Sequence, residues 1–454
     1  MPRSGAAAYD AIVSSTDSAI ATTDTDANAQ LGRATLAKVG WRLLPFLLLL
    51  YIVAWIDRVN ISVAALQMKP DLGLSDTVFG FGAGIFFAGY ALFEVPSNLI
   101  LARVGPRFWI ARIMITWGIL SVLMMFVQGP ISFYALRFLL GVAEAGFLPG
   151  IIYYLSGWFP GAERARAVSW FMVAIPLASV IGQPLSGLLL ELDGWHGLEG
   201  WHWLFLLEGV PAIALGFVVL AYLTDSPDKA EWLTPEERAW LTERVRGEQR
   251  VAEQRHGIGS WRTAFRHPTV WLLALILFAC QTGNYGLQFW IPQIVKGLSG
   301  YSNLATSMIA ALPYAAAAVG MIVIARSSDR TGERVLHIAI PSAIAGVAFI
   351  VGAQFTLLLP AMLALTIASV GDLGTRGPFW ALPTRFLTGS AAAAGIALIN
   401  TCASVGGFVG PYAIGFLRDH TGGSNAAGLV FLGVLMLLAA AATLALRRAR
   451  ALAD

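Results

Sequence analysis

The stretch Trp41–Leu66, WRLLPFLLLLYIVAWIDRVNISVAAL, is long and apolar enough to cross a lipid bilayer as a helix. It nevertheless holds Asp57, Arg58 and Asn60 well inside the span. A charged side chain at the bilayer centre costs about 2.5–3.5 kcal/mol on insertion scales, so such charges must face protein or a water-filled cavity. The two charges are adjacent and opposite in sign. They either form an ion pair that pins helices together or belong to a site for a polar solute.

The composition of the whole chain is that of a membrane protein. Of its 454 residues, 57% are hydrophobic and 13% are charged, which is about half the charged share of a soluble domain. Cys280 and Cys402 both lie in apolar runs and are expected to be core residues rather than a disulfide or metal pair. No CxxC, HExxH, P-loop or GxSxG pattern indicates enzyme chemistry.

Apolar segments of spanning length follow one another along the chain. Twelve spans are predicted, at 41–66, 77–100, 107–129, 131–155, 166–190, 201–223, 268–293, 304–326, 336–355, 358–387, 391–416 and 424–446. A polar linker with a short surface helix separates six spans from six. The N-terminal residues are rich in Ala, Ser, Thr and Asp without helical period, which predicts a disordered tail. The expected organisation is a tail (1–33), a six-helix bundle (34–223), the linker (224–267), a second six-helix bundle (268–446) and a tail (447–454).

Lysine and arginine are distributed unevenly between the two sides of the predicted spans. The side that holds both termini and the linker carries most of them, whereas the other side holds Lys69, Lys296 and Arg418. Because cytoplasmic loops are enriched in Lys and Arg, both termini are expected in the cytoplasm. No short apolar core with a small-residue cleavage site precedes the first span, so the spans themselves are expected to direct the chain to the inner membrane.

Motifs in both halves carry a resemblance to a known family. The segment 329–334, DRTGER, resembles the cytoplasmic loop signature of the major facilitator superfamily, and Ala102 replaces the acid of the first-half copy. AWIDRVNISVAA at 54–65 and GVAEAGFLPG at 141–150 are similar to the first and fourth helices of its anion:cation symporter family. Segments that resemble the branch carrying tartrate, phthalate, hydroxyphenylacetate and similar carboxylates lie at 93–101, 109–118, 377–387 and 395–400.

This resemblance implies a fold and a place for the site. The implied fold is an all-α membrane protein of twelve transmembrane helices, with two six-helix bundles around a central cavity. Helices 1, 4, 7 and 10 of that fold surround the cavity. The resemblance also places Tyr90, Trp380 and Asn400 at substrate-facing positions, and it assigns Asp329 and Arg330 to a gating or structural loop.

Ionisable residues deep inside spans are the main candidate site residues. Most fall on the first, fourth and tenth spans, and charges avoid lipid, so these spans are expected to surround a polar cavity. Arg58 is the candidate for binding an anion, because its planar fork matches a carboxylate in two-point fashion. Asp57 is its natural competitor, since the ionised carboxylate screens Arg58 and the protonated one leaves it free. Two further acids, Glu94 and Glu208, are expected only to brace helices.

The fourth span holds a second pair of charges. Arg137 and Glu144 lie seven residues apart, two turns along one helix face. Arg137 either meets water or an outer gate, or forms a structural ion pair. Glu144 sits among small residues, where desolvation disfavours the charged carboxylate and suits a proton carrier; the alternative is a bond to a neighbouring helix. Asp57 and Glu144 are the predicted proton-coupling residues, with Glu144 as the main carrier because no cation adjoins it in sequence.

Residues of the second half complete the predicted binding site. Tyr285 and Gln288 lie at a depth in the seventh span like that of Arg58 in the first span, so the internal repeat makes them candidate substrate-binding residues. An aromatic residue at such a position also commonly packs against a neighbouring helix. Arg376, one turn after Asp372, is expected either to attract a second carboxylate or to brace the helix through Asp372. The apolar middle of the fifth span, 171–175, argues against a heavily hydroxylated sugar acid and for an aromatic or less polar carboxylate.

The predicted function is proton-coupled uptake of a small organic anion, an aromatic carboxylate or a dicarboxylate, by alternating access. The expected partners are the carboxylate, protons and the lipid bilayer. Neither nucleic acid nor a metal or cofactor is expected, and a proton gradient is the driving force for a monomeric carrier. The alternative is a proton-antiport exporter of drugs or metabolites. A non-transporting sensor would need a large soluble signalling domain, which this sequence lacks.

Overall fold

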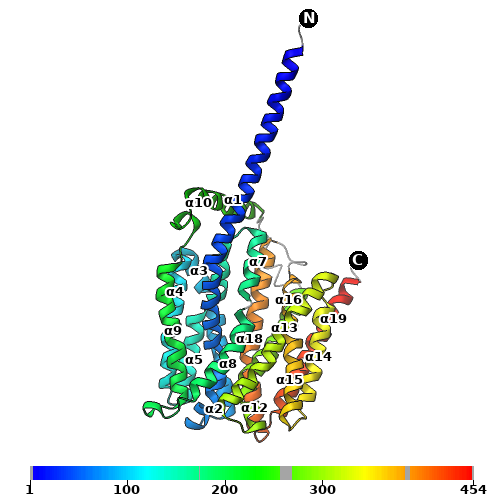
Figure 1. Ribbon diagram of the computed structural model, residues 1–454. Helices are drawn as coiled ribbons and strands as arrows, with labels where there is room; N and C mark the ends of the chain where they lie inside the picture. The colour runs from blue at the N-terminus through cyan, green and yellow to red at the C-terminus, as the bar shows by residue number, and fades with distance from the viewer. Residues whose placement is uncertain (1–3, 173, 256–267, 384–388, 452–454) are drawn as a thin grey trace.

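The computed structural model describes residues 4–172, 174–255, 268–383 and 389–451, and within them the chain is helical with turns and no strand (Figure 1). Ten of the described helices are long and apolar enough to cross a membrane. Two shorter apolar helices, Ala174–Leu190 and Leu336–Gly352, stand where the sequence predicts spans at 166–190 and 336–355.

The first six spans form one half of the molecule. Three of them consist of two helical pieces each, and the break between α5 and α6 contains Gly146. The elements are α1 (Ser4–Val59) with α2 (Ile61–Asp71), α3 (Asp76–Val104), α4 (Pro106–Leu123), α5 (Pro130–Glu144) with α6 (Phe147–Ser156), α7 (Gly161–Met172) with α8 (Ala174–Leu190), and α9 (Gly200–Tyr222).

The second half repeats this arrangement. Its elements are α12 (Pro268–Ser299), α13 (Asn303–Thr331), α14 (Leu336–Gly352), α15 (Leu358–Gly374) with α16 (Arg376–Trp380), α18 (Gly389–His420) and α19 (Ala426–Ala451). Figure 1 shows α4 and α9 on the left and α14, α15 and α19 on the right, with all spans running between two ends. We call these the α10 end, which carries α10 (Pro235–Arg255), and the α2 end.

The N-terminal segment differs from the prediction. The sequence predicts a disordered tail over 1–33, whereas α1 already begins at Ser4 and continues into the first span. Figure 1 shows this part of α1 extending away from the bundle. Alanine is frequent in the segment and is the strongest helix former, so a helix needs no hydrophobic period there.

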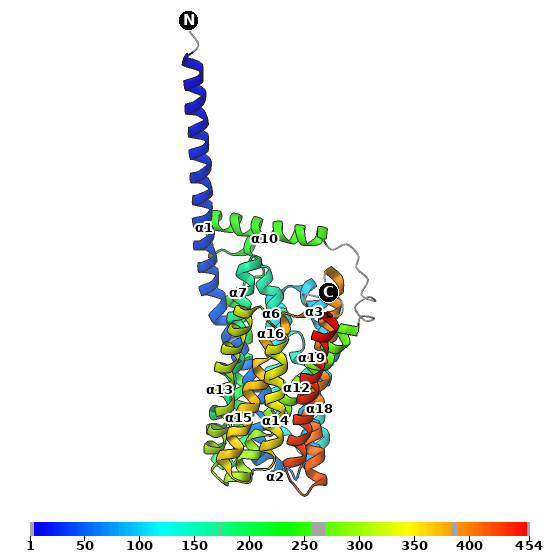
Figure 2. The ribbon, with the colours of Figure 1, turned by 90° about the vertical axis from the view of Figure 1, so that its right-hand side faces the viewer.

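The polar linker between the halves places α10 across one end of the first half (Figure 2). The helix begins with a capping box, in which the Thr234 hydroxyl accepts the Glu237 N–H and the Glu237 carboxylate accepts the Thr234 N–H. Lys38 of α1 donates to Glu237 at 2.8 Å, and this hydrogen bond lowers the pKa of the Glu237 carboxyl. Glu248 accepts the Gly161 N–H at 2.9 Å, so α10 is held to both α1 and α7. Residues 256–267 of the predicted linker lie outside the described residues.

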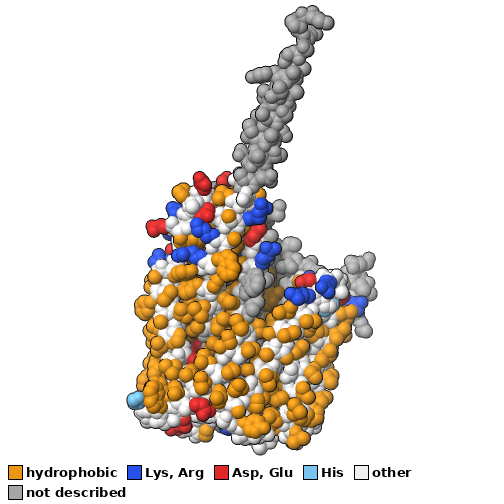
Figure 3. Space-filling model, in the orientation of Figure 1, with side chains coloured by type: hydrophobic (Ala, Val, Ile, Leu, Met, Phe, Trp, Pro, Cys, Tyr) orange, Lys and Arg blue, Asp and Glu red, His pale blue; other side chains and the backbone are white. Residues whose placement is uncertain are grey.

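The outer surface of the bundle matches a membrane environment. Figure 3 shows hydrophobic side chains covering the sides of the bundle, while Lys and Arg gather at the α10 end. Large apolar side chains such as Leu359, Val319 and Phe217 are more than half exposed. Such a surface is costly in water and favourable against lipid tails.

Small residues let the two halves approach each other closely along α3 and α18. A side chain at Gly80 would clash with the Pro411 carbonyl oxygen, and one at Gly84 would press on the Phe408 backbone. On α18, a side chain at Gly415 would meet the Asp76 carbonyl oxygen. Glycines at such positions permit backbone-to-backbone packing between membrane helices.

Candidate functional site

An arginine–glutamate ion pair is buried in the first half. Arg58 of α1 donates to the carboxylate of Glu144 at the end of α5, 86 residues away in sequence. The two residues are only 7% and 1% exposed. The fourth span breaks directly after Glu144, because Gly146 adopts a left-handed conformation with φ of 86°. A side chain at Gly146 would press on Ser97 of α3, so the break also allows close packing.

Asp57 and Arg58 do not form the ion pair that one of the two alternatives supposed. The Asp57 carboxylate instead accepts hydrogen bonds from Trp117 and Ser121 of α4 and from Asn60, the last at 3.2 Å. Successive residues of a helix point about 100° apart, so adjacency in sequence aims the two side chains at different neighbours. Arg58 is therefore balanced by Glu144, whereas Asp57 fastens α1 to α4.

Aromatic rings enclose the Arg58 guanidinium. Its central carbon lies 5.3 Å from the Trp55 ring, 5.3 Å from the Phe86 ring and 5.2 Å from the Tyr90 ring. Rings at this distance stabilise a cation electrostatically. The predicted substrate-facing residue Tyr90 thus adjoins the predicted anion-binding residue.

Arg137 does not meet water as one alternative supposed. It is 1% exposed and donates to the carbonyl oxygens of Gly82 and Ala83, each at 3.3 Å. Its guanidinium also lies 5.1 Å from the Phe86 ring. Arg137 therefore ties α5 to α3 and adds positive charge to the same interior.

Three predicted site residues of the second half lie on α12 and α16. The ring of Tyr285 lies 4.3 Å from Phe87 of α3, and Tyr285 is close enough to Arg58 to interact with its charge. Gln288 is buried, and its side-chain oxygen has no hydrogen-bond partner among the described residues. Trp380 is 40% exposed at the end of α16. Tyr285 therefore contacts the first half, whereas Trp380 lies at the exposed end of α16.

Asn400 makes a contact that crosses from one half to the other. Its amide donates to both carboxylate oxygens of Glu94, at 3.2 and 3.3 Å. Glu94 also lies close enough to Arg58 to interact with its charge. Glu94, expected only to brace a helix, therefore belongs to the site. Glu94 lies four residues after Tyr90, on the same helix face, and this spacing could have identified it as a site residue from the sequence.

A second residue that the sequence prediction missed is Tyr51 of α1. Tyr51 lies within electrostatic reach of Arg58, Glu144 and Tyr285. It stands seven residues before Arg58, which is two helical turns on the same face. That spacing could have nominated it as a hydroxyl donor beside the arginine.

Two charges lie together in the second half. Asp372 of α15 and Arg376 of α16 are 3.5 Å apart, and Arg376 also donates to the Cys280 carbonyl oxygen at 3.3 Å. The loop pair predicted for gating is separate, since Asp329 binds Arg334 at 2.6 Å and Arg330 is exposed at the α10 end.

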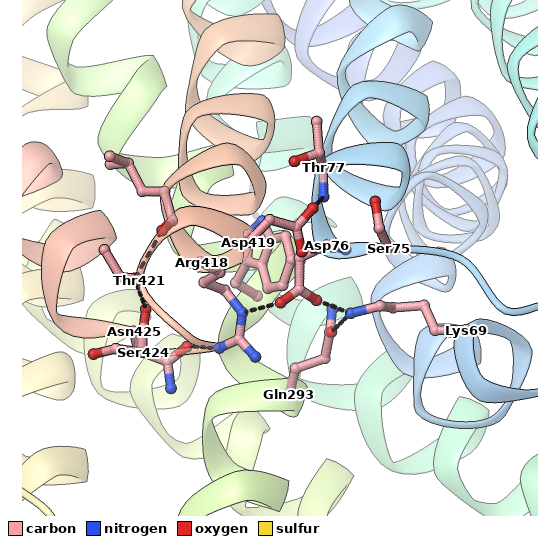
Figure 4. A network of polar contacts seen from close by, with 12 residues as sticks. Lys69, Ser75, Asp76, Thr77, Gln293, Arg418, Asp419, Thr421, Ser424 and Asn425 are labelled. Atoms are coloured by element: carbon pink, nitrogen blue, oxygen red, sulfur yellow. Dashed lines mark hydrogen bonds and ion pairs between the residues drawn. The ribbon is translucent and has the colours of Figure 1, made fainter.

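A network of polar contacts closes the α2 end between the halves (Figure 4). The Asp76 carboxylate accepts from Lys69 of α2 and, at 2.9 Å, from Arg418 of α18. The Asp419 carboxylate accepts the N–H groups of Asp76 and Thr77, at 3.2 and 2.8 Å, and so caps α3 from the other half. Charges of both halves thus hold this end shut.

Arg418→Gln is expected to weaken the closed α2 end, because it removes the ion pair with Asp76 and a cation 5.0 Å from the Trp290 ring. Electron-spin distances between labels at Ile131 and Leu357, both exposed at this end, should gain a longer component. The labels would be attached in a Cys402→Ala background.

Lys296→Gln is the matched control, since Lys296 donates to the Tyr301 carbonyl oxygen within its own half. It should leave the distance distribution unchanged. An unchanged distribution for Arg418→Gln would mean that the Asp76 network does not hold the halves together.

Comparison with known proteins agrees with this architecture. Residues 47–411 match the Major Facilitator Superfamily. The chain belongs to this superfamily. As a superfamily member it is a multi-pass membrane transporter rather than an enzyme, and its helices form the twelve-helix fold of two bundles around a central cavity.

Two relatives illustrate the range of similar superfamily members. A putative tartrate transporter of Agrobacterium vitis is 52% identical over 424 residues, covering 93% of this chain and 96% of the relative. A quinolone resistance transporter of Acinetobacter baumannii is 42% identical over 400 residues, covering 88% and 92%.

Among solved structures, the fold is similar to a bacterial homologue of the human lysosomal transporter Spinster, in an inward-facing and occupied conformation. The TM-score is 0.74 at 20% identity, with 89% of this chain and 96% of the other covered. At that identity the likeness concerns the fold alone.

Proposed function

We propose that the protein imports a small dicarboxylate together with protons, by alternating access of the two halves, 34–223 and 268–446. The observation that carries this proposal is the buried Arg58–Glu144 pair, enclosed by aromatic rings and reached by Tyr285 from the other half. A guanidinium in such a place binds a carboxylate in two-point fashion. Similarity to a putative tartrate transporter over most of both chains supports a dicarboxylate of about that size.

Competition for Arg58 couples the proton to the substrate. In the empty protein, the Glu144 carboxylate neutralises the buried guanidinium. A proton that binds Glu144 removes its negative charge, so Arg58 becomes available to a substrate carboxylate. After reorientation the substrate leaves, Glu144 releases the proton on the other side, and the ion pair forms again. Thus Glu144, rather than Asp57, is the acid whose protonation changes the charge balance of Arg58.

The second carboxylate of the substrate is assigned to Arg376. Arg58 and Arg376 stand in different halves, so a dianion that binds both draws the halves together. Arg376→Gln should therefore weaken tartrate binding about thirtyfold, equivalent to about 2 kcal/mol for a charge-assisted contact. Glycerate, which is tartrate without one carboxylate, should bind the variant and the wild type about equally. An equal loss of both ligands would mean that Arg376 only braces the helix through Asp372.

The orientation follows from charge. Because Lys and Arg gather at the α10 end, we propose that this end and both termini lie in the cytoplasm of a bacterial cell, with the chain in the inner membrane as a monomer. The Asp76 network then closes the outer side, and the described state faces inward.

Uptake of labelled tartrate into proteoliposomes tests the proposed function. An inward proton gradient should concentrate tartrate inside, and collapse of the gradient by a protonophore should release it. Similarity to the quinolone resistance transporter is the observation that supports the alternative function, proton-antiport export. It predicts that the same gradient drives a quinolone outward and leaves tartrate untouched.

A further inference from the structure

Asp372 is a buried acid whose charge is poorly balanced. It is 2% exposed, and its Oδ1 atom has no hydrogen-bond partner among the residues that the structure describes. Its ion partner there is Arg376, whose guanidinium faces this same Oδ1 atom at 3.5 Å, which is longer than a charge-assisted hydrogen bond. Burying a carboxylate with so little compensation is costly, so this atom is suited to a further cation.

Uncharged groups from other helices surround the Asp372 carboxylate. The Tyr314 hydroxyl of α13 lies within electrostatic reach of Asp372 and is buried without a hydrogen-bond partner in the described part of the chain. The Cys280 thiol of α12 also lies within electrostatic reach of Asp372, and the Ser342 hydroxyl of α14 faces this thiol. The titratable groups facing Asp372 are thus Cys280, Tyr314 and Arg376, while Met436 of α19 adds an apolar wall near Gly283.

Arg376 is the more exposed member of the pair that it forms with Asp372. Its side chain is 15% exposed, compared with 2% for Asp372, and it lies four residues before the exposed Trp380. A guanidinium in this position can point to Asp372 or to a substrate carboxylate. When it turns to the substrate, the buried Asp372 loses its ion partner and becomes uncompensated.

We infer that Asp372 is a second cation-uptake site of the transporter, filled by one monovalent cation, a proton or sodium, when Arg376 engages the substrate. The inference rests on the proposed function. The cation enters from the outer side, binds the carboxylate oxygen with the Tyr314 hydroxyl nearby, and leaves inside when Arg376 returns to Asp372. Together with the proton on Glu144, it makes the transfer of a dianion electroneutral.

The test compares the wild type with Asp372→Asn in proteoliposomes whose membrane voltage is clamped at zero by potassium and valinomycin. At a gradient of one pH unit, each coupled proton multiplies the equilibrium ratio of tartrate inside to outside about tenfold. A tenfold inward sodium gradient at equal pH gives the same factor per coupled sodium ion. Asp372→Asn keeps the shape of the side chain but carries no charge, so it should couple one cation fewer. Its equilibrium ratio of tartrate inside to outside should therefore be about tenfold lower than that of the wild type under one of these gradients.

Ser369→Ala is the matched control, because Ser369 is buried on the same helix and donates to the Leu365 carbonyl oxygen instead. It should keep the wild-type ratio. If Asp372→Asn alone does not fold, because Arg376 is then left unpaired, the double variant with Arg376→Gln removes both charges and is compared with Arg376→Gln alone.

The outcomes separate this inference from the proposed function. A lower ratio for Asp372→Asn under the pH gradient identifies a proton, and a lower ratio under the sodium gradient identifies sodium. An unchanged ratio under both gradients overturns the assignment of Asp372 and leaves the import function standing. A wild type that concentrates no tartrate under either gradient overturns both proposals.

Discussion

Glu144→Gln is expected to keep tartrate exchange across the membrane while losing proton-driven net uptake by at least about tenfold. Glutamine resembles the protonated acid in shape and charge, so the loaded carrier can still reorient. The empty carrier cannot, because Arg58 is then buried without a counter-ion, and an uncompensated buried charge costs about 3–5 kcal/mol. Exchange bypasses the empty return step, whereas net uptake needs it in every cycle.

Paired measurements in the same liposomes decide this prediction. Counterflow exchange reports the loaded carrier, and uptake driven by an inward proton gradient reports the complete cycle. Glu208→Gln is a useful control, since Glu208 is another buried acid of the first half but accepts a hydrogen bond from Ser186, at 2.7 Å, rather than from Arg58. If Glu144→Gln accumulates tartrate at the wild-type rate, Glu144 is structural and the proton binds elsewhere.

Arg58→Lys should lose about thirtyfold in tartrate affinity although the positive charge remains. A lysine ammonium is a point charge, so it cannot present two parallel donors to one carboxylate, and about 2 kcal/mol of charge-assisted hydrogen bonding is lost. Its smaller head also cannot span the space between Glu144 and the rings of Trp55 and Tyr90 in the same way. Arg58→Ala should abolish detectable binding.

Calorimetric titration of the detergent-purified variants with tartrate measures this loss directly. Arg112→Lys serves as the control, because Arg112 is a half-buried arginine of α4 that stacks 4.5 Å from the Trp109 ring, outside the site. It should retain wild-type affinity. Near wild-type binding by Arg58→Ala would remove Arg58 from the substrate site.

The sequence alone was sufficient to predict that the chain spans a membrane and which spans carry charged residues in the protein interior. Hydropathy over about twenty residues and the high cost of a charge in lipid are properties of a local segment, so they can be read from the chain. Asp57, Arg58, Arg137 and Glu144 were therefore recognised as interior residues, and the structure buries all four. The polar linker that contains α10 could be predicted for the same reason, because low hydropathy is also a property of a local segment.

Partner choice among those residues was decided only by the tertiary structure. Arg58 reaches Glu144 rather than its neighbour Asp57, and Glu94 reaches Asn400 of the other half. These choices depend on how each helix is rotated and which helix packs beside it, and neither quantity is fixed by local hydropathy. Two residues adjacent on a helix point about 100° apart, whereas residues 86 positions apart can meet when their helices pack together.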